Sequence, residues 1–174
     1  VRAVVERELG APLEAHFASF DAHPLASASI GQVHAATLPD GREVVVKVQR
    51  PGVEAQIEQD LEIVRVAVDW ASTHTELGRQ YDLGVLHEEF ARTIREELDY
   101  RLEAANADRL RTALCRDAIV RIPDVYPSHS TRRVLTLERL GGLRLTDGAA
   151  LDRERIPRRA VAENAVRLFL RQVF

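Results

Sequence analysis

The chain has 174 residues and a formal net charge of −3, and 45% of its residues are hydrophobic. This composition is typical of a globular protein and excludes a disordered chain, and without an excess of basic residues there is no electrostatic signature of nucleic-acid binding. The single cysteine, Cys115, excludes an internal disulfide framework and is typical of a reducing compartment.

The N-terminal third predicts a short helix followed by a β-hairpin. Residues 1–9 form an amphipathic pattern that ends at Gly10, a residue suited to a left-handed helix cap. Gln32–Leu38 and Arg42–Gln49 are rich in strand-forming residues and flank Pro39-Asp40-Gly41, a typical turn sequence. A loop of small residues leads into this hairpin.

The rest of the chain predicts helices on either side of two further strands. Apolar residues recur at helical spacing from Val53 to about Ser72 and again from Val85 to Leu114. Ile119–Tyr126 and Arg133–Leu140 have strand character, and Arg155–Phe174 predicts a final amphipathic helix. The sequence therefore predicts an α+β protein with a small antiparallel sheet and an extra pair of long helices.

Residues 26–33 and 44–47 fit two protein-kinase motifs in the right order and at hairpin spacing. The kinase phosphate loop G-x-G-x-x-G-x-V is met by ASASIGQV, which has alanine at the first two glycine positions and keeps Gly31 and Val33. VVVK then fits the V-A-I-K strand. Lys47 is the sole lysine of the chain, and arginine cannot replace lysine's compact point charge at a phosphate. We interpret Lys47 as a phosphate-binding residue; the alternative is a lysine that snorkels from an edge strand.

A phosphate-binding lysine on a strand needs a carboxylate partner, which in kinases is a glutamate on a helix beside the sheet. The predicted helix from Val85 to Leu114 offers six candidates: Glu88, Glu89, Glu96, Glu97, Asp99 and Glu103. Most of them predict a solvated face that pairs with arginines at helical spacing. Asp99 and Glu103 lie one turn apart, and their spacing does not decide between them.

Three segments, PLASASIGQVHAATLPDGREVVVKVQRPGV, EELDYRLEAAN and VLTLERLGG, resemble the UbiB (AarF-like) family of atypical protein-kinase-like proteins in sequence and in order. The resemblance implies that Lys47 contacts the α- and β-phosphates and that Glu103 pairs with it. It also implies an alanine-rich nucleotide loop made of Ala26, Ser27, Ala28, Ser29, Ile30 and Gly31, with Val33 after it.

The same resemblance assigns two further groups of residues. Glu97 and Asp99 would form the family's E-x-D motif, which meets an N-terminal helical extension over the pocket. Residues 137–140 would form the hinge, with Leu137 as the gatekeeper and with the backbone carbonyl of Glu138 and the backbone amide of Leu140 hydrogen-bonding adenine. The family's K-x-G-Q motif has no counterpart before Leu25.

The family fold implies a kinase-like N-lobe over residues 1–140, with a helical insertion at about 53–114, and the first helices of a truncated C-lobe over 141–174. ATP or ADP is the implied cofactor. We expect no catalytic residue and no metal ligand within this chain, because the family's catalytic-loop and D-F-G residues would follow residue 174. Mg²⁺ is expected only in the full-length parent, and the isolated chain is expected to be inactive.

The implied function is the ATP/ADP-binding part of an ATPase or of a small-molecule or lipid kinase that supports isoprenoid-quinone biosynthesis or lipid homeostasis. The alternative is a non-catalytic kinase-like regulatory or scaffold module that binds a lipid or a protein partner. A third interpretation is an α+β domain whose Lys47 and glutamates are ordinary surface charges. The expected partners are a nucleotide, a lipid or quinone precursor and other proteins, but not nucleic acid. The expected location is cytoplasmic, with membrane association through other parts of the parent.

Overall fold

The computed structural model describes residues 1–115 and 120–173, which divide into two compact units. The first unit comprises Val1–Ala113 and Ile122–Arg139, and the second consists mainly of the residues from Leu140 onward. An antiparallel sheet with helices makes up the first unit, which confirms the predicted α+β class. Of the predicted site residues, all except Leu140 belong to this unit.

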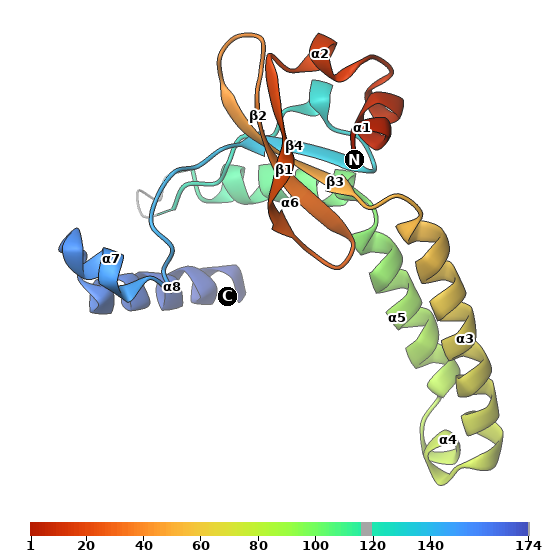
Figure 1. Cartoon of the computed structure of the whole chain (residues 1–174). Helices are drawn as coiled ribbons and strands as arrows, with labels where there is room; N and C mark the ends of the chain where they lie inside the picture. Colours follow the sequence, from red (N-terminus) through yellow and green to blue (C-terminus); the bar gives the residue numbers. More distant parts are fainter. Residues whose placement is uncertain (116–119, 174) are drawn as a thin grey trace. The chain divides into compact units, whose positions relative to one another are not determined.

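A four-stranded antiparallel sheet in the order β1-β2-β3-β4 forms the centre of the first unit (Figure 1). In the β2–β3 hairpin, Gly41 takes a φ of 87°, a conformation that favours glycine in the turn. The register of the hairpin pairs Val33 with Lys47. The strands are β1 Ser19–Ser27, β2 Gly31–Thr37, β3 Glu43–Gln49 and β4 Val134–Glu138.

The hydrophobic core lies between one face of the sheet and the N-terminal helices α1 (Arg2–Leu9) and α2 (Leu13–His16). Val44, Val46 and Val48 of β3 are fully buried in it. Because side chains alternate across a strand, the residues between these valines face the other side of the sheet. Lys47 is therefore directed away from the core.

Two long helices, α3 (Val53–His74) and α5 (Leu83–Glu97), pack side by side and are joined through α4 (Glu76–Gln80) (Figure 1). Helix α6 (Tyr100–Ala113) follows and contacts β4. We predicted one continuous helix from Val85 to Leu114, and this was wrong.

The break falls at Leu98 and Asp99. The Asp99 carboxylate accepts a hydrogen bond from the backbone N–H of Arg101 at 3.0 Å. The N–H of Tyr100 donates to the carbonyl of Arg132 at 3.0 Å instead of to a carbonyl of α5. These local and tertiary hydrogen bonds replace the helical i→i−4 bonds here, although the four-residue spacing of apolar residues continues through the break.

Two predicted segments differ in the structure. Residues 19–27 form β1, which the sequence did not indicate; as a result Ala26 and Ser27, predicted in the loop, are paired with β2. The strand predicted at 119–126 is absent from the described residues 120–126, apart from an isolated bridge between Val125 and Leu137. Residue 119 lies outside the described residues. The 3₁₀ helix η1 (Pro127–His129) follows.

The second unit contains α7 (Gly148–Arg153) and α8 (Arg158–Val173). The carboxylate of Asp147 caps α7 by accepting a hydrogen bond from the N–H of Ala150 at 3.0 Å. Helix α8 begins three residues after the predicted start at Arg155, which itself has a φ of 55°. Within residues 1–115 and 120–173, none of the helices combines the length and the hydropathy needed to cross a bilayer.

His129 of η1, a partly buried histidine, is expected to make the stability of the protein depend on pH. His129 packs against Phe17 and edge-on to His16, with ring centroids 5.7 and 5.6 Å away. Burial, followed by the nearby charge of His16, lowers the pKa of His129 below its usual value of 6.5. The unfolded chain therefore takes up this proton at a higher pH than the folded protein does. Stability is complete above about pH 6.5 and falls as the pH decreases through that value.

We expect the free energy of unfolding in urea to be lower at pH 5.5 than at pH 7.5. His129→Gln should reduce this difference, whereas His23→Gln, at a fully exposed side chain, should leave it unchanged. Equal pH dependence of the two variants would contradict the prediction.

Candidate functional site

Lys47 and Glu103 form an ion pair on the face of the sheet opposite the hydrophobic core. The Nζ atom of Lys47 lies 2.6 Å from Oε2 of Glu103, and the two side chains are 28% and 44% exposed. The sequence had left Asp99 and Glu103 as alternatives, and the structure brings Glu103 to the lysine. An ion pair with this exposure contributes only about 0–1 kcal/mol to stability. The ion pair therefore adds little to the stability of the fold, and a contribution to stability does not explain why it is there.

The Lys47–Glu103 pair opens into a cleft of about 430 Å³. Glu97, the last residue of α5, lines it together with Asp99. The guanidinium of Arg101 binds the Asp99 carboxylate at 2.6 Å, and this hydrogen bond lowers the pKa of Asp99 against the opposing effect of burial. Asp99 thus stays ionised and holds the start of α6. The complete lining is Lys47, Glu96, Glu97, Asp99, Leu102, Glu103 and Asn106.

The alanine-rich segment forms the connection between β1 and β2. Ala26 and Ser27 belong to β1, and Gly31 begins β2. The N–H of Ala28 donates to the carbonyl of Gly31 at 2.8 Å and closes the turn. Among the described residues, Arg155 is the only non-glycine residue with positive φ, so the alanines of this turn adopt ordinary backbone conformations.

The end of the turn lies close to Lys47 along the sheet. The register pairs Gly31 with Gln49 and Val33 with Lys47, so the lysine is two residues from the loop. Two residues correspond to roughly 7 Å along a strand. A lysine side chain on the same face can bridge that distance.

An apolar cleft of about 440 Å³ lies beside the same loop. Ser29 and Ile30 form one side of it, and helices α3 and α5 form the other. The lining residues are Ser29, Ile30, Ile57, Asp60, Leu61, Val64, Phe90, Ile94 and Glu97. We call this feature the apolar cleft.

The sequence interpretation missed two residues that link β3, which carries Lys47, to the start of α6. Tyr100 is 1% exposed, and the Nζ atom of Lys47 lies 4.7 Å from the centroid of its ring. Tyr100 and Glu103 are three residues apart on α6, a spacing that places them on one helix face and could have identified the tyrosine.

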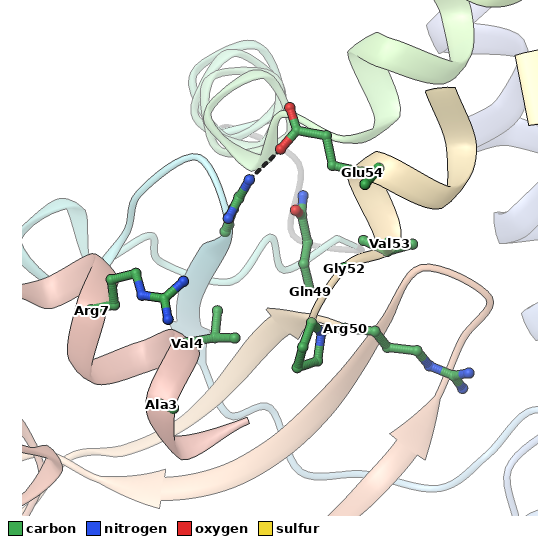
Figure 2. A pocket seen from close by; sticks show the side chains of 11 residues that line it. Ala3, Val4, Arg7, Gln49, Arg50, Gly52, Val53 and Glu54 are labelled. Atoms are coloured by element: carbon green, nitrogen blue, oxygen red, sulfur yellow. Dashed lines mark hydrogen bonds and ion pairs between the residues drawn. The ribbon is translucent and has the colours of Figure 1, made fainter. Parts of the chain in front are cut away.

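The second missed residue, Gln49, lies two positions after Lys47 and therefore shares its face of β3. Its buried Nε2 donates to the carbonyl of Leu98 at 2.6 Å, which ties β3 to the α5–α6 break. Figure 2 shows Gln49 beside a cavity of about 370 Å³ that α1 and the start of α3 border. Glu54 of α3 also lines this cavity (Figure 2) and forms an ion pair with Arg133.

The predicted hinge residues lie at and after the end of β4. Leu137 pairs with Val45 and Glu138 with Val44. The N–H of Glu138 donates to the carbonyl of Asp124 at 2.8 Å. Leu140 belongs to the second unit, so its part in an adenine site stays a prediction, as do those of Leu137 and Glu138. In residues 1–115 and 120–173, there is no group of three or more His, Cys, Asp or Glu side chains that could hold a metal ion.

Comparisons with known proteins identify the family. The description of the matching family is "ABC1 atypical kinase-like domain", and the match covers residues 1–174. The chain belongs to the ABC1 family. Among curated relatives, the "Probable protein kinase UbiB" of Cellvibrio japonicus is 40% identical over 98% of this chain and 31% of its own length. The protein of the same name from Xylella fastidiosa (strain 9a5c) is 43% identical over 99% of this chain and 31% of its own length.

A solved ABC1-like structure shares the fold. This structure, described as the complex of Rv3197 and erythromycin from Mycobacterium tuberculosis, has a TM-score of 0.74 and 34% sequence identity to the chain. The match covers 84% of this chain and 36% of the solved chain. The chain thus spans about a third of the length of these relatives, and its architecture is that of an ABC1 kinase-like domain.

Proposed function

We propose that the first unit of this ABC1 domain binds ATP or ADP, with Lys47 as the residue that contacts the phosphates. The observation that carries the proposal is the pair of Lys47 and Glu103, 2.6 Å apart and two residues along the sheet from the alanine-rich turn. The carboxylate orients the ammonium group. Because the Lys47 side chain is partly exposed, it has room for a second anionic partner.

The charges around the lysine support a nucleotide that carries a bound cation. Glu96, Glu97 and Asp99 line the same cleft as Lys47 and Glu103. A bare polyphosphate would meet these carboxylates with like charge, which is unfavourable. Mg²⁺ on the nucleotide would neutralise part of the phosphate charge, so we expect the Mg²⁺ complex to bind more tightly than the free nucleotide.

For the whole protein we propose an ATPase or a small-molecule or lipid kinase that supports isoprenoid-quinone biosynthesis or lipid homeostasis. The name UbiB of the curated relatives supports the link to quinone biosynthesis. The hinge residues Leu137, Glu138 and Leu140 are proposed to contact adenine, and Glu97 and Asp99 to act as the E-x-D motif.

A thermal-shift titration of the 174-residue chain with ATP and ADP, with and without Mg²⁺, tests nucleotide binding. At a ligand concentration of 100 times the Kd, the stabilisation is about 2.7 kcal/mol, which corresponds to a rise in Tm of roughly 5–10 °C. A Tm that does not move at millimolar nucleotide, either with or without Mg²⁺, would contradict the proposal.

Ala28→Gly tests the role of the loop. Because Ala28 has an ordinary φ, glycine adds conformational freedom that must be lost on folding, and we expect stability to fall by about 0.4–1 kcal/mol. The added freedom also lets the backbone amides approach a phosphate differently, so the Kd for ATP or ADP should change. Ala15→Gly, at an exposed position of α2, is the matched control; it should cost similar stability and leave nucleotide affinity unchanged. Unchanged affinity in Ala28→Gly would remove the loop from the site.

The apolar cleft favours a second candidate, the binding of a lipid or quinone precursor by a non-catalytic module. Six of its nine lining residues are aliphatic or aromatic, which suits a small apolar ligand. The M. tuberculosis structure is described as a complex with erythromycin, so a relative binds a ligand other than a nucleotide. Titration of a short-chain prenylphenol into the wild type and into Phe90→Glu tests this candidate; equal binding by both would contradict it.

A further inference from the structure

Tyr100 carries a buried hydroxyl group that makes no hydrogen bond within the described residues. The side chain is 1% exposed, and its Oη atom has no hydrogen-bond partner among the described residues. An unpaired buried hydroxyl is unfavourable, and a phenylalanine would fill the same space without that cost. Hydrogen bonding within the described residues therefore does not explain a tyrosine at this position.

The ring of Tyr100 supports the lysine of the proposed nucleotide site. The Nζ atom of Lys47 lies 4.7 Å from the ring centroid, within the range of a cation–π interaction. The same ammonium group is 2.6 Å from Glu103, one helical turn further along α6. Helix α6 thus holds Lys47 through both an aromatic face and a carboxylate.

The hydroxyl of Tyr100 reaches the end of the alanine-rich turn. A β-carbon at Gly31 would lie 2.6 Å from Oη of Tyr100 and 2.8 Å from the carbonyl oxygen of Val48. Gly31 also accepts the hydrogen bond from Ala28 that closes the turn. The phenol therefore sets how closely the turn approaches α6.

Tyr100 itself is held firmly at the start of α6. Its N–H donates to the carbonyl of Arg132, and the carbonyl of Leu98 accepts a hydrogen bond from Gln49. The backbone at and before Tyr100 is thus held in place, while its side chain contacts the lysine and borders the turn.

We propose that Tyr100 is a positioning residue, whose ring fixes the ammonium group of Lys47 and whose hydroxyl fixes the end of the alanine-rich turn at Gly31. The consequence for affinity rests on the proposed nucleotide function. The contacts themselves do not, and they can be tested without any nucleotide.

The sole lysine of the chain makes a direct test practical. In protein labelled with [ε-¹³C]lysine, all side-chain lysine signal comes from Lys47. The ring should shift the ε-methylene signal upfield in the wild type and in Tyr100→Phe. Tyr100→Leu should lose this shift. An identical lysine signal in the wild type and in folded Tyr100→Leu would overturn the proposal.

Nucleotide affinity provides the second measurement. Tyr100→Leu should weaken Mg²⁺–ATP binding roughly 3- to 30-fold, the range expected for a cation–π contact. Tyr100→Phe keeps the ring and should lose much less affinity. If Tyr100→Leu moves the lysine signal but binds ATP as the wild type does, the positioning role is overturned. If the wild type does not bind ATP and the lysine signal does not respond to it, the proposed nucleotide function fails, and the NMR comparison alone decides the contact.

A double-mutant cycle between Gly31 and the hydroxyl tests the other half and does not depend on Tyr100→Leu folding. Gly31→Ala should weaken ATP binding because the new methyl group meets Oη and the Val48 carbonyl. In the Tyr100→Phe background one of these two contacts is gone, so the same substitution should cost less affinity. If the wild type does not bind ATP, the cycle is measured on unfolding free energies. Equal cost in both backgrounds would overturn the role of the hydroxyl.

Discussion

Replacing Lys47 by alanine should weaken the binding of Mg²⁺–ATP and Mg²⁺–ADP by roughly 10- to 150-fold. A hydrogen bond to a charged group contributes about 1.5–3 kcal/mol, and Lys47 supplies the proposed phosphate contact. Lys47→Arg should restore little of this affinity, because the planar guanidinium fork does not reproduce the compact point charge of lysine beside Glu103 and the ring of Tyr100. Isothermal titration calorimetry on the 174-residue chain measures both effects.

Arg65→Ala is the matched control for this change. It removes one positive charge from an exposed position on α3, where the guanidinium pairs with Glu62 and Asp69. Affinity within about twofold of the wild type is expected, since surface ion pairs contribute little and this one lies outside the clefts described above. If Lys47→Ala bound nucleotide as Arg65→Ala does, Lys47 would be an ordinary surface charge.

Replacing Gln49 by methionine should lower the free energy of unfolding by about 1–3 kcal/mol. Methionine preserves the volume but leaves the buried carbonyl of Leu98 without its 2.6 Å hydrogen bond, and an unpaired buried acceptor has that cost. The bond also locates the break between α5 and α6. We therefore expect weaker nucleotide binding as well, because Tyr100 and Glu103 follow the break directly.

Urea denaturation at pH 7.5 measures the first effect, and Gln56→Met on the exposed side of α3 is the control. The control should change the free energy of unfolding by no more than about 0.5 kcal/mol. A Gln49→Met protein as stable as the control would show that the Leu98 carbonyl finds another donor.

The sequence predicted the hairpin and the place of Lys47 because each depends on local chemistry. Pro39-Asp40-Gly41 specifies a turn, and the valines of β3 specify a strand with one buried face. The same local information is missing for β1. Its pairing with β2 shifts register on both sides of Pro24, and all but one of its residues are exposed, so no alternating pattern marks it.

The break in the long helix and the choice of Glu103 depend on tertiary contacts. Apolar residues recur every four residues through Leu98, so the spacing alone predicts continuity. The competing bonds come from Gln49 and from the carbonyl of Arg132, which lie 49 and 32 residues from their partners Leu98 and Tyr100. Spacing on a helix defines a face but not the residue that a strand meets, and for that reason Asp99 remained an alternative to Glu103.

The position of β1 bears on the tendency of the protein to aggregate. The strand order β1-β2-β3-β4 makes β1 an edge strand, and the unpaired backbone groups of an edge strand can recruit a strand from another molecule. Pro24 has no N–H to offer an incoming strand, and the irregular pairing on both sides of it twists the edge out of plane. We expect the β1 edge to resist the addition of a strand from another molecule. The protein should therefore stay unaggregated at concentrations at which a flat, proline-free edge would nucleate fibrils.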